Sequence, residues 1–132
     1  MGLGDLFKKR PERFVSESAA AANVATQVAM TGETLTQLRQ IGVGPERQLK
    51  LEFFFYTDTE AKSAALASQL RKLGYSVQSG LAASSTPQYL VTGWSTPVHM
   101  NEDSVAAWTR EMCDIGFAHD CGFDGWGTTP DQ

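Results

Sequence analysis

The sequence predicts an α+β protein built on an antiparallel sheet with two helices on one face. Residues 49–56 form a strongly apolar, aromatic stretch that suits a central strand, because on a sheet edge it would recruit another chain. Helical patterns follow at residues 57–73 and 101–116, and each is followed by strand-like residues. The order strand, helix, strand, strand, helix, strand is the split βαβ, or ferredoxin-like, pattern.

The composition is that of an ordinary globular chain: 132 residues, of which 42% are hydrophobic and 20% charged. We divide it into an N-terminal tail and helical extension, residues 1–30, and a main domain, residues 31–132. The formal net charge of −4 argues against general nucleic-acid binding. Residues 101–132 hold seven acidic side chains and a single arginine. This acidic end suits a basic partner, although a merely solubilising surface explains it equally well.

The localisation follows from the absence of targeting signals in the sequence. No apolar run approaches the length of about 20 residues that spans a bilayer. The alanine-rich stretch before Met30 is interrupted by polar residues, so it makes a poor signal-peptide core. We therefore expect a cytoplasmic protein without membrane contact.

The first third of the chain is expected to be helical. Residues 1–16 are charged and interrupted by Pro11, which is typical of a mobile tail. Residues 16–30 are rich in alanine and favour a helix. A separate short helix is expected over residues 31–41, ended by Gly42. Its apolar side consists of Leu35, Leu38 and Ile41.

The central strand, residues 49–56, leads into the first helix of the main domain. Thr57 and Glu60 fit a capping box at the start of that helix. Gly74 lies where a left-handed cap is favoured at its end. Strands are then expected at residues 75–78 and 88–95, on either side of a loop of small residues.

The last helix is expected to begin after the capping residue Asn101 and to end at Gly116. Its apolar stripe, at helical spacing, consists of Val105, Trp108, Met112 and Ile115. Such a stripe is more typical of a core than of a cofactor site. A short glycine-rich strand, residues 121–128, completes the sheet.

Alternation along the strands assigns side chains to the two faces of the sheet. The helix side is expected to take Leu49, Leu51, Phe53, Phe55, Tyr75, Val77 and Phe123. The uncovered side is expected to take Phe54, Tyr56, Asp124 and Trp126, with Trp94 or Leu90. A large aromatic face should not stay bare in a monomer. Either the N-terminal helical segment covers it, which we favour, or it is a binding platform.

The sequence shows no catalytic constellation and no motif that implies a cofactor. His119, Asp120, Cys121 and Cys113 could be imagined as a metal site. However, no paired Cys-x-x-Cys or His-Glu-x-x-His spacing supports one, and Cys113 suits a buried apolar position better. No phosphate-binding glycine loop or nucleophile elbow is found. We expect a non-enzymatic protein without a metal.

An RNA-binding module is the alternative function. RNA-recognition domains use this topology, with aromatic residues on the central strands that stack on bases. Phe54, Tyr56 and Trp94 could serve as such a platform. However, residues 88–95 contain no basic residue, and the acidic C-terminal third lacks the charge that supplies most affinity for nucleic acid.

The final strand is the most specific part of the sequence. The segment Phe123-Asp-Gly-Trp-Gly-Thr128 resembles the terminal signature of the regulator of ribonuclease E activity B (RraB) family. The likeness extends upstream over residues 35–44, 53–56, 58–65 and 70–77, so that it covers roughly residues 31–128. The resemblance implies a ferredoxin-like fold and a bacterial regulator that binds ribonuclease E and lowers its activity through protein–protein contact.

The carried-over residues of the signature are Phe123, Asp124, Gly125, Trp126 and Gly127. Phe123 is expected to anchor the core, and the two glycines to allow tight turns. Asp124 and Trp126 are expected on the open face as part of a protein-binding site with Phe54, Tyr56 and Trp94. The alternative is structural: Asp124 caps a turn and Trp126 seals the sheet edge. The sequence leaves the oligomeric state open.

Overall fold

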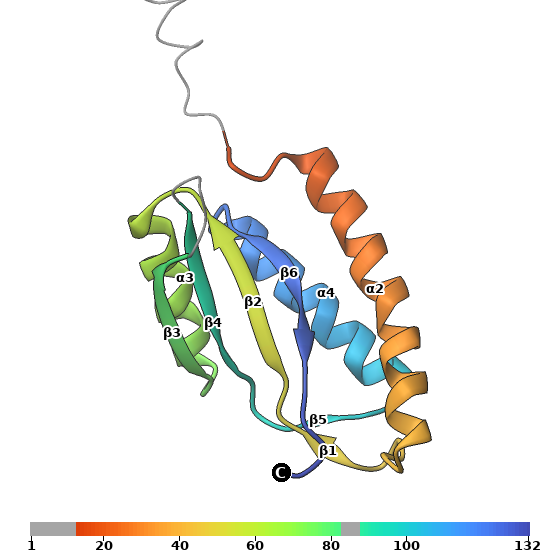
Figure 1. The fold of residues 1–132 in the computed structure, drawn as a ribbon. Coiled ribbons are helices and arrows are strands. Elements are labelled where there is room, and N and C mark those ends of the chain that lie inside the picture. The colour runs from red at the N-terminus through yellow and green to blue at the C-terminus, as the bar shows by residue number, and fades with distance from the viewer. Residues whose placement is uncertain (1–12, 83–87) are drawn as a thin grey trace, which may run out of the picture.

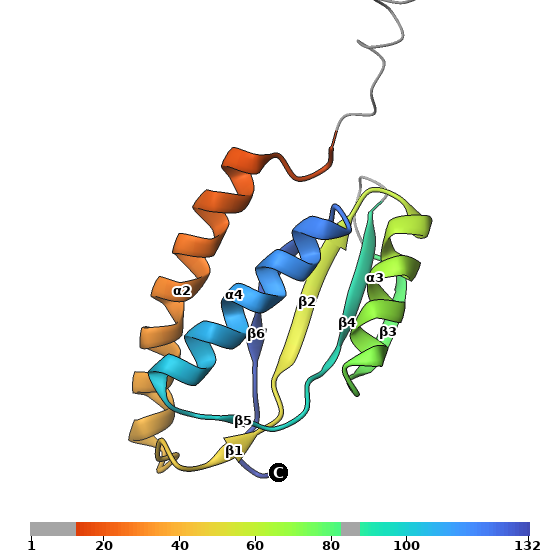
Figure 2. The same ribbon diagram turned by 180° about the vertical axis from the view of Figure 1, so that it is seen from behind.

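The computed structural model of the chain describes residues 13–82 and 88–132. Most of the expected mobile tail, and the middle of the loop before the third strand, lie outside the described residues. The protein is a mixed α/β structure in which helices and antiparallel strands form two layers (Figures 1 and 2). Its helices are α2 (Glu17–Gln40), α3 (Glu60–Lys72) and α4 (Glu102–Ala118). Its strands are β1 (Gln48–Leu49), β2 (Glu52–Thr57), β3 (Ser76–Leu81), β4 (Tyr89–Trp94), β5 (Val98–His99) and β6 (Gly122–Gly127).

The main sheet has four antiparallel strands in the order β3-β4-β2-β6. β2, which contains most of the expected central strand, therefore has a neighbour on each side, and so does β4. Helices α3 and α4 lie on the same face of this sheet, which Figure 2 shows from the helix side. The opposite face, turned towards the viewer in Figure 1, is crossed by no described helix.

The apolar stretch expected as one strand is divided into β1 and β2 around Lys50 and Leu51. Here the backbone amides donate to side chains, while the Ser95 amide donates to the Leu51 carbonyl at 2.9 Å. The Lys50 amide donates to Gln132 Oε1 at 2.7 Å, and the Leu51 amide donates to Ser95 Oγ at 2.9 Å. β1 instead pairs with β5 in a separate two-stranded sheet, which the sequence pattern did not predict.

The two N-terminal helices expected from the sequence are one helix. α2 passes through the expected break at Thr31 and Gly32 without interruption, and Thr31 Oγ1 donates back to the Gln27 carbonyl at 3.1 Å. The expected end is correct, since Gly42 has a positive φ of 91°. The prediction that the N-terminal helical segment covers the free face of the sheet is wrong. α2 instead packs beside β6 and against α4 (Figure 1).

The first capping prediction is displaced by two residues. Thr59, not Thr57, caps α3, and its side chain accepts from the Lys62 amide at 3.2 Å. Thr57 instead is buried and donates to the Asp120 carbonyl at 2.9 Å. The expected left-handed residue after α3 is confirmed, because Gly74 has a φ of 87°.

The last helix, α4, begins where it was expected and ends later than expected. Asn101 caps α4 by accepting from the Ser104 amide at 2.7 Å. Gly116 is not its end: it lies within the helix, where an added Cβ would approach the Phe55 ring to 2.8 Å. α4 continues to Ala118, and the left-handed turn falls on Asp120, with a φ of 57°. A close approach to the sheet, not a turn, therefore explains this glycine.

The core lies between the sheet and its two helices, as predicted. Every side chain expected on the helix side is in it: Leu49, Leu51, Phe53, Phe55 and Phe123 are buried, while Tyr75 and Val77 pack against them. α4 contributes its expected stripe, with Ile115 only partly buried. Leu35 and Leu38 of α2 join the same cluster, whereas Ile41 is 62% exposed.

Candidate functional site

The uncovered face of the sheet carries a row of large side chains from its two central strands. Strand register places Glu52 opposite Trp94, Phe54 opposite Thr92, and Tyr56 opposite Leu90. All six side chains are partly exposed. The predicted positions of Phe54, Tyr56 and Trp94 on this face are thus confirmed, and Leu90 joins them. We call these six residues the open face.

Trp126 does not lie on the open face, contrary to the sequence-based prediction. It stands opposite Phe53, a helix-side residue, and its ring packs edge-on against Trp108 at 6.5 Å between centroids. The cause is a β-bulge, because Trp126 lies three positions after Phe123, whereas their partners on β2, Phe53 and Phe55, are two positions apart. The bulge reverses the alternation after Asp124.

The two glycines of the signature differ in their roles. Gly125 has a φ of 111°, a conformation that side chains rarely adopt, but it lies in the bulge within β6 and not in the expected tight turn. Gly127 has no positive φ, and a Cβ added to it would meet no atom within 4 Å. The expected tight turn at Gly127 is therefore wrong.

A small hollow lies where the open face meets α2 and the bulge. We call it the β6 notch, and its volume is about 210 Å³. It is lined by Gln27, Met30 and Thr34 of α2, Phe54 of β2, and Asp124, Gly125 and Trp126 of β6. Asp124 and Met30 are both exposed. The α2 residues were missed as site residues because the sequence pattern was interpreted as two helices with a break at residue 31.

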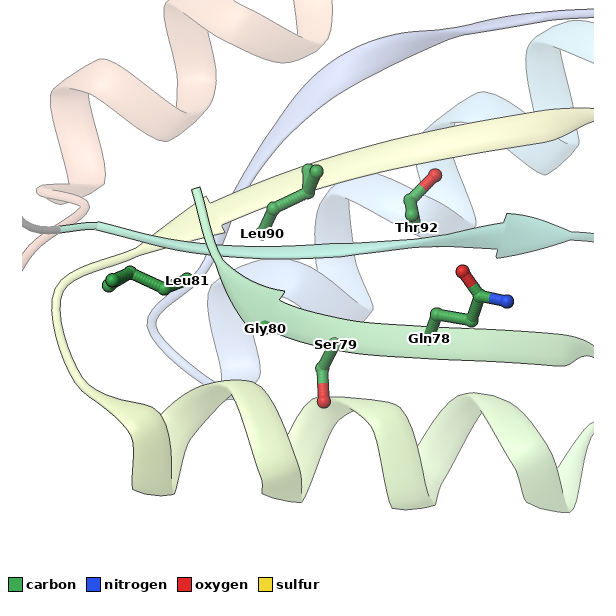
Figure 3. A pocket seen from close by; sticks show the side chains of 6 residues that line it. All are labelled: Gln78, Ser79, Gly80, Leu81, Leu90 and Thr92. Atoms are coloured by element: carbon green, nitrogen blue, oxygen red, sulfur yellow. The ribbon is translucent and has the colours of Figure 1, made fainter. Parts of the chain in front are cut away.

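A second hollow lies at the opposite side of the open face, over β3 and β4 (Figure 3). Leu90 and Thr92 of β4 point to the same side of the sheet in this view, while Ser79 points towards α3. Gly80 lacks a side chain opposite Leu90, which leaves the surface recessed. Among the described residues, the buried hydroxyl of Thr92 has no hydrogen-bond partner.

The open face and the notch carry negative charge. Glu52 and Asp124 flank Phe54, and no lysine or arginine occurs among the strand residues that register places on this side of the main sheet. Within residues 13–82 and 88–132, the ion pairs involve other groups: Lys62 with Asp58 and Asp120, and Arg13 with Asp120. The exposed Lys50 lines a further hollow with Trp94 at the other end of this surface. The part around Asp124 and the notch is therefore the part suited to a partner with positive charge.

Asp120 forms a buried polar cluster that the sequence did not indicate. Its carboxylate accepts from the amides of Phe14 and Val15, each at 2.8 Å, and from Lys62 Nζ at 2.7 Å. Arg13 adds an ion pair and lies over the Phe117 ring. The cluster fastens residues 13–15 to the end of α4, so this part of the expected mobile tail is ordered.

The ionisation of this cluster favours the charged pair. Burial raises the pKa of Asp120, but the hydrogen bonds from Lys62, Val15 and Phe14 outweigh it, and the net pKa is lowered. The pKa of Lys62 is raised by its hydrogen bonds to Asp120 and Asp58. The charged Asp120 carboxylate thus connects Phe14, Val15 and the α3 residue Lys62 to the segment that follows α4.

His119, Asp120, Cys121 and Cys113 do not come together as a metal-binding group. In the described part of the chain, no group of three or more histidine, cysteine or acidic side chains is arranged to hold a metal ion. Cys113 is buried, as expected, and Cys121 is buried as well. Burial raises the pKa of each thiol to about 11. Neither thiol is poised for nucleophilic chemistry at neutral pH.

The fold and the site together define a small α/β protein with a partly exposed, aromatic and acidic sheet face. The family model described as regulator of ribonuclease activity B matches residues 28–128. The chain belongs to this family, as its resemblance predicted, and the family is one of regulators of ribonuclease activity. No curated protein matches the chain. None of the helices in the described residues is long and apolar enough to cross a lipid bilayer.

Proposed function

We propose that this protein is a non-enzymatic regulator that binds ribonuclease E in the bacterial cytoplasm and lowers its activity in RNA decay. The observation that carries the proposal is the open face, where Phe54, Tyr56 and Trp94 are partly exposed beside carboxylates. Exposed aromatic side chains are enriched at protein interfaces, since they bury much area and lose little rotamer freedom. Membership of a family of ribonuclease regulators supplies the class of target.

The arrangement suits protein contact by its shape and charge. The open face is flanked by two hollows, the β6 notch and the hollow over β3 and β4. Such a surface offers sites for individual side chains of a partner around an aromatic centre. We assign the main sheet and its helices to the ferredoxin-like fold, with the order of its strands in support. α2 supplies one wall of the surface through Met30.

RNA binding through the same aromatic residues is less well supported. Glu52 and Asp124 would repel a phosphate backbone, and the strand residues on this side of the main sheet include no lysine or arginine. Stacking alone would then have to overcome electrostatic repulsion. A shift in RNA mobility at low salt that disappears with added salt would favour this alternative.

A pull-down from lysate of the native bacterium tests the proposed partner. The bait is the full chain, compared with a Trp94→Ala/Asp124→Asn variant and with a control variant, Ile41→Ala/Asp114→Asn. The control changes one exposed apolar and one exposed acidic residue away from the open face. The proposal expects ribonuclease E with the wild type and the control, and its loss with the open-face variant. Absence of ribonuclease E from the wild-type fraction contradicts it.

A further inference from the structure

We propose that the β6 notch binds the side chain of an arginine that a protein partner contributes. This inference rests on the proposed function in one respect, namely that the occupant of the open face is a protein. It goes further by assigning the chemistry of one contact.

The charge of the notch is negative and points outwards. Asp124 is its acidic residue, it is exposed, and the bulge places it beside Phe54. Its other polar lining comes from the neutral side chains Gln27 and Thr34. In residues 13–82 and 88–132, no cation lies within ion-pair distance of Asp124. A cationic group from outside would complete the site.

The walls of the notch favour a guanidinium over an ammonium group. Phe54 supplies an aromatic ring, and Met30, which is 50% exposed, supplies an apolar edge. A guanidinium is planar and weakly hydrated, so it can stack on an aromatic ring while it donates two parallel hydrogen bonds to a carboxylate. The methylene groups of the arginine would lie against Met30. Lysine offers a point charge that cannot make this double contact.

The size of the notch fits one side chain and little more. Its volume of about 210 Å³ is below the range of roughly 300–1,000 Å³ that is typical of small-molecule sites. The notch adjoins the open face, because Phe54 belongs to the open face and also lines the notch. A polypeptide that crosses the open face can therefore place one long side chain in the notch.

Nuclear magnetic resonance of the full, ¹⁵N-labelled chain tests this inference without ribonuclease E. The probe is a capped hexa-arginine peptide at physiological salt, compared with capped hexa-lysine and hexa-citrulline. We expect the largest shift changes at the Asp124 and Gly125 amides and at the Trp126 indole. Arginine should bind at least about threefold more tightly than lysine, because of the ring and fork contacts. The neutral citrulline peptide should not bind.

Two matched variants separate the notch from general attraction to an acidic protein. Asp124→Asn should weaken hexa-arginine binding by at least about fivefold, because the charge-assisted contact is lost. Asp114→Asn, which removes another exposed carboxylate, from α4, should change it by less than about twofold. Equal losses in the two variants, shift changes confined to other surfaces, or equal binding of lysine would overturn the inference.

The outcome is distinguishable from that of the proposed function. Arginine binding in the notch, together with failure to retain ribonuclease E, would uphold the notch and remove the named partner. Retention of ribonuclease E that is lost in Trp94→Ala but not in Asp124→Asn would uphold the open face and overturn the notch.

Discussion

Trp126 stands directly opposite Phe53 on the helix side of the sheet, although alternation from Phe123 would put it on the other side. The bulge at Asp124 and Gly125 brings this about. It has two results at once: the Trp126 ring reaches Trp108, and the Asp124 carboxylate is directed to the surface beside Phe54. The signature segment therefore joins the core to the proposed binding surface.

Replacing Gly125 should destabilise the protein. A Gly125→Ala variant would force a side chain into a φ of 111°, at a cost on the order of 1–2 kcal/mol in the free energy of unfolding. Gly127→Ala is the matched control, because that glycine has no positive φ and a Cβ there meets open space. Urea unfolding of both variants measures the difference. Equal stability of the two would show that the bulge does not require glycine.

Removing residues 1–30 should lower the melting temperature and increase the binding of a hydrophobic dye. The deletion removes the first half of α2, including Asn23, which donates to the Phe123 carbonyl at 2.7 Å. It would also uncover the edge of β6 and one side of Trp126. Differential scanning calorimetry and dye fluorescence measure these effects. A truncated protein with unchanged melting and dye binding would contradict the observed packing of α2.

The Asp120 cluster should make stability depend on pH. The carboxyl pKa is lower in the folded state, so its contribution is present above the unfolded pKa of about 3.9 and is lost as the pH falls through the folded value. Asp120→Asn should cost on the order of 1–3 kcal/mol at neutral pH, because bonds to a buried charge are lost. Asparagine is also tolerated at the left-handed φ of this position.

Urea unfolding of the wild type and Asp120→Asn between pH 2 and 7 measures this dependence. The difference between the two proteins should be largest near neutrality and should shrink in acid. Asp58→Asn is a suitable control, since its carboxylate shares Lys62 but is exposed. A constant difference across the range would show that the carboxylate charge plays no part.

The two cysteines should be unreactive in the native protein. Burial raises the pKa of Cys113 and Cys121 to about 11, so at pH 8 roughly one thiol in a thousand is ionised. A thiol reagent should therefore modify both slowly in the folded state and rapidly in denaturant. Rapid modification of either cysteine in buffer would contradict its burial.

Much of the core and of the open face could be predicted from the sequence. Two-residue alternation in a central aromatic strand assigns Phe53 and Phe55 to one face and Phe54 and Tyr56 to the other, and the structure agrees. Alternation holds wherever strand register is regular. The apolar stripe of α4 was predictable from its helical spacing, because one face of that helix packs on the core.

The errors have local causes that a single sequence does not display. The register shift at Gly125 depends on pairing with β2, so counting along β6 alone placed Trp126 on the wrong face. Gly116 resembled a helix end, but its small size serves the contact with Phe55. The division between β1 and β2 depends on Ser95 and Gln132, which are distant in sequence. Long-range contacts decided each of these features.

The cleavage rate of purified ribonuclease E, measured with increasing amounts of this protein, tests the central claim most directly. The wild type should slow cleavage of an RNA substrate in a saturable manner. Trp94→Ala/Asp124→Asn should need at least about tenfold more protein for the same effect, because it removes an aromatic anchor and a charge from the open face. Trp126 is left unchanged, since it packs on Trp108. Equal inhibition by the two proteins, or no inhibition by the wild type, would contradict the claim.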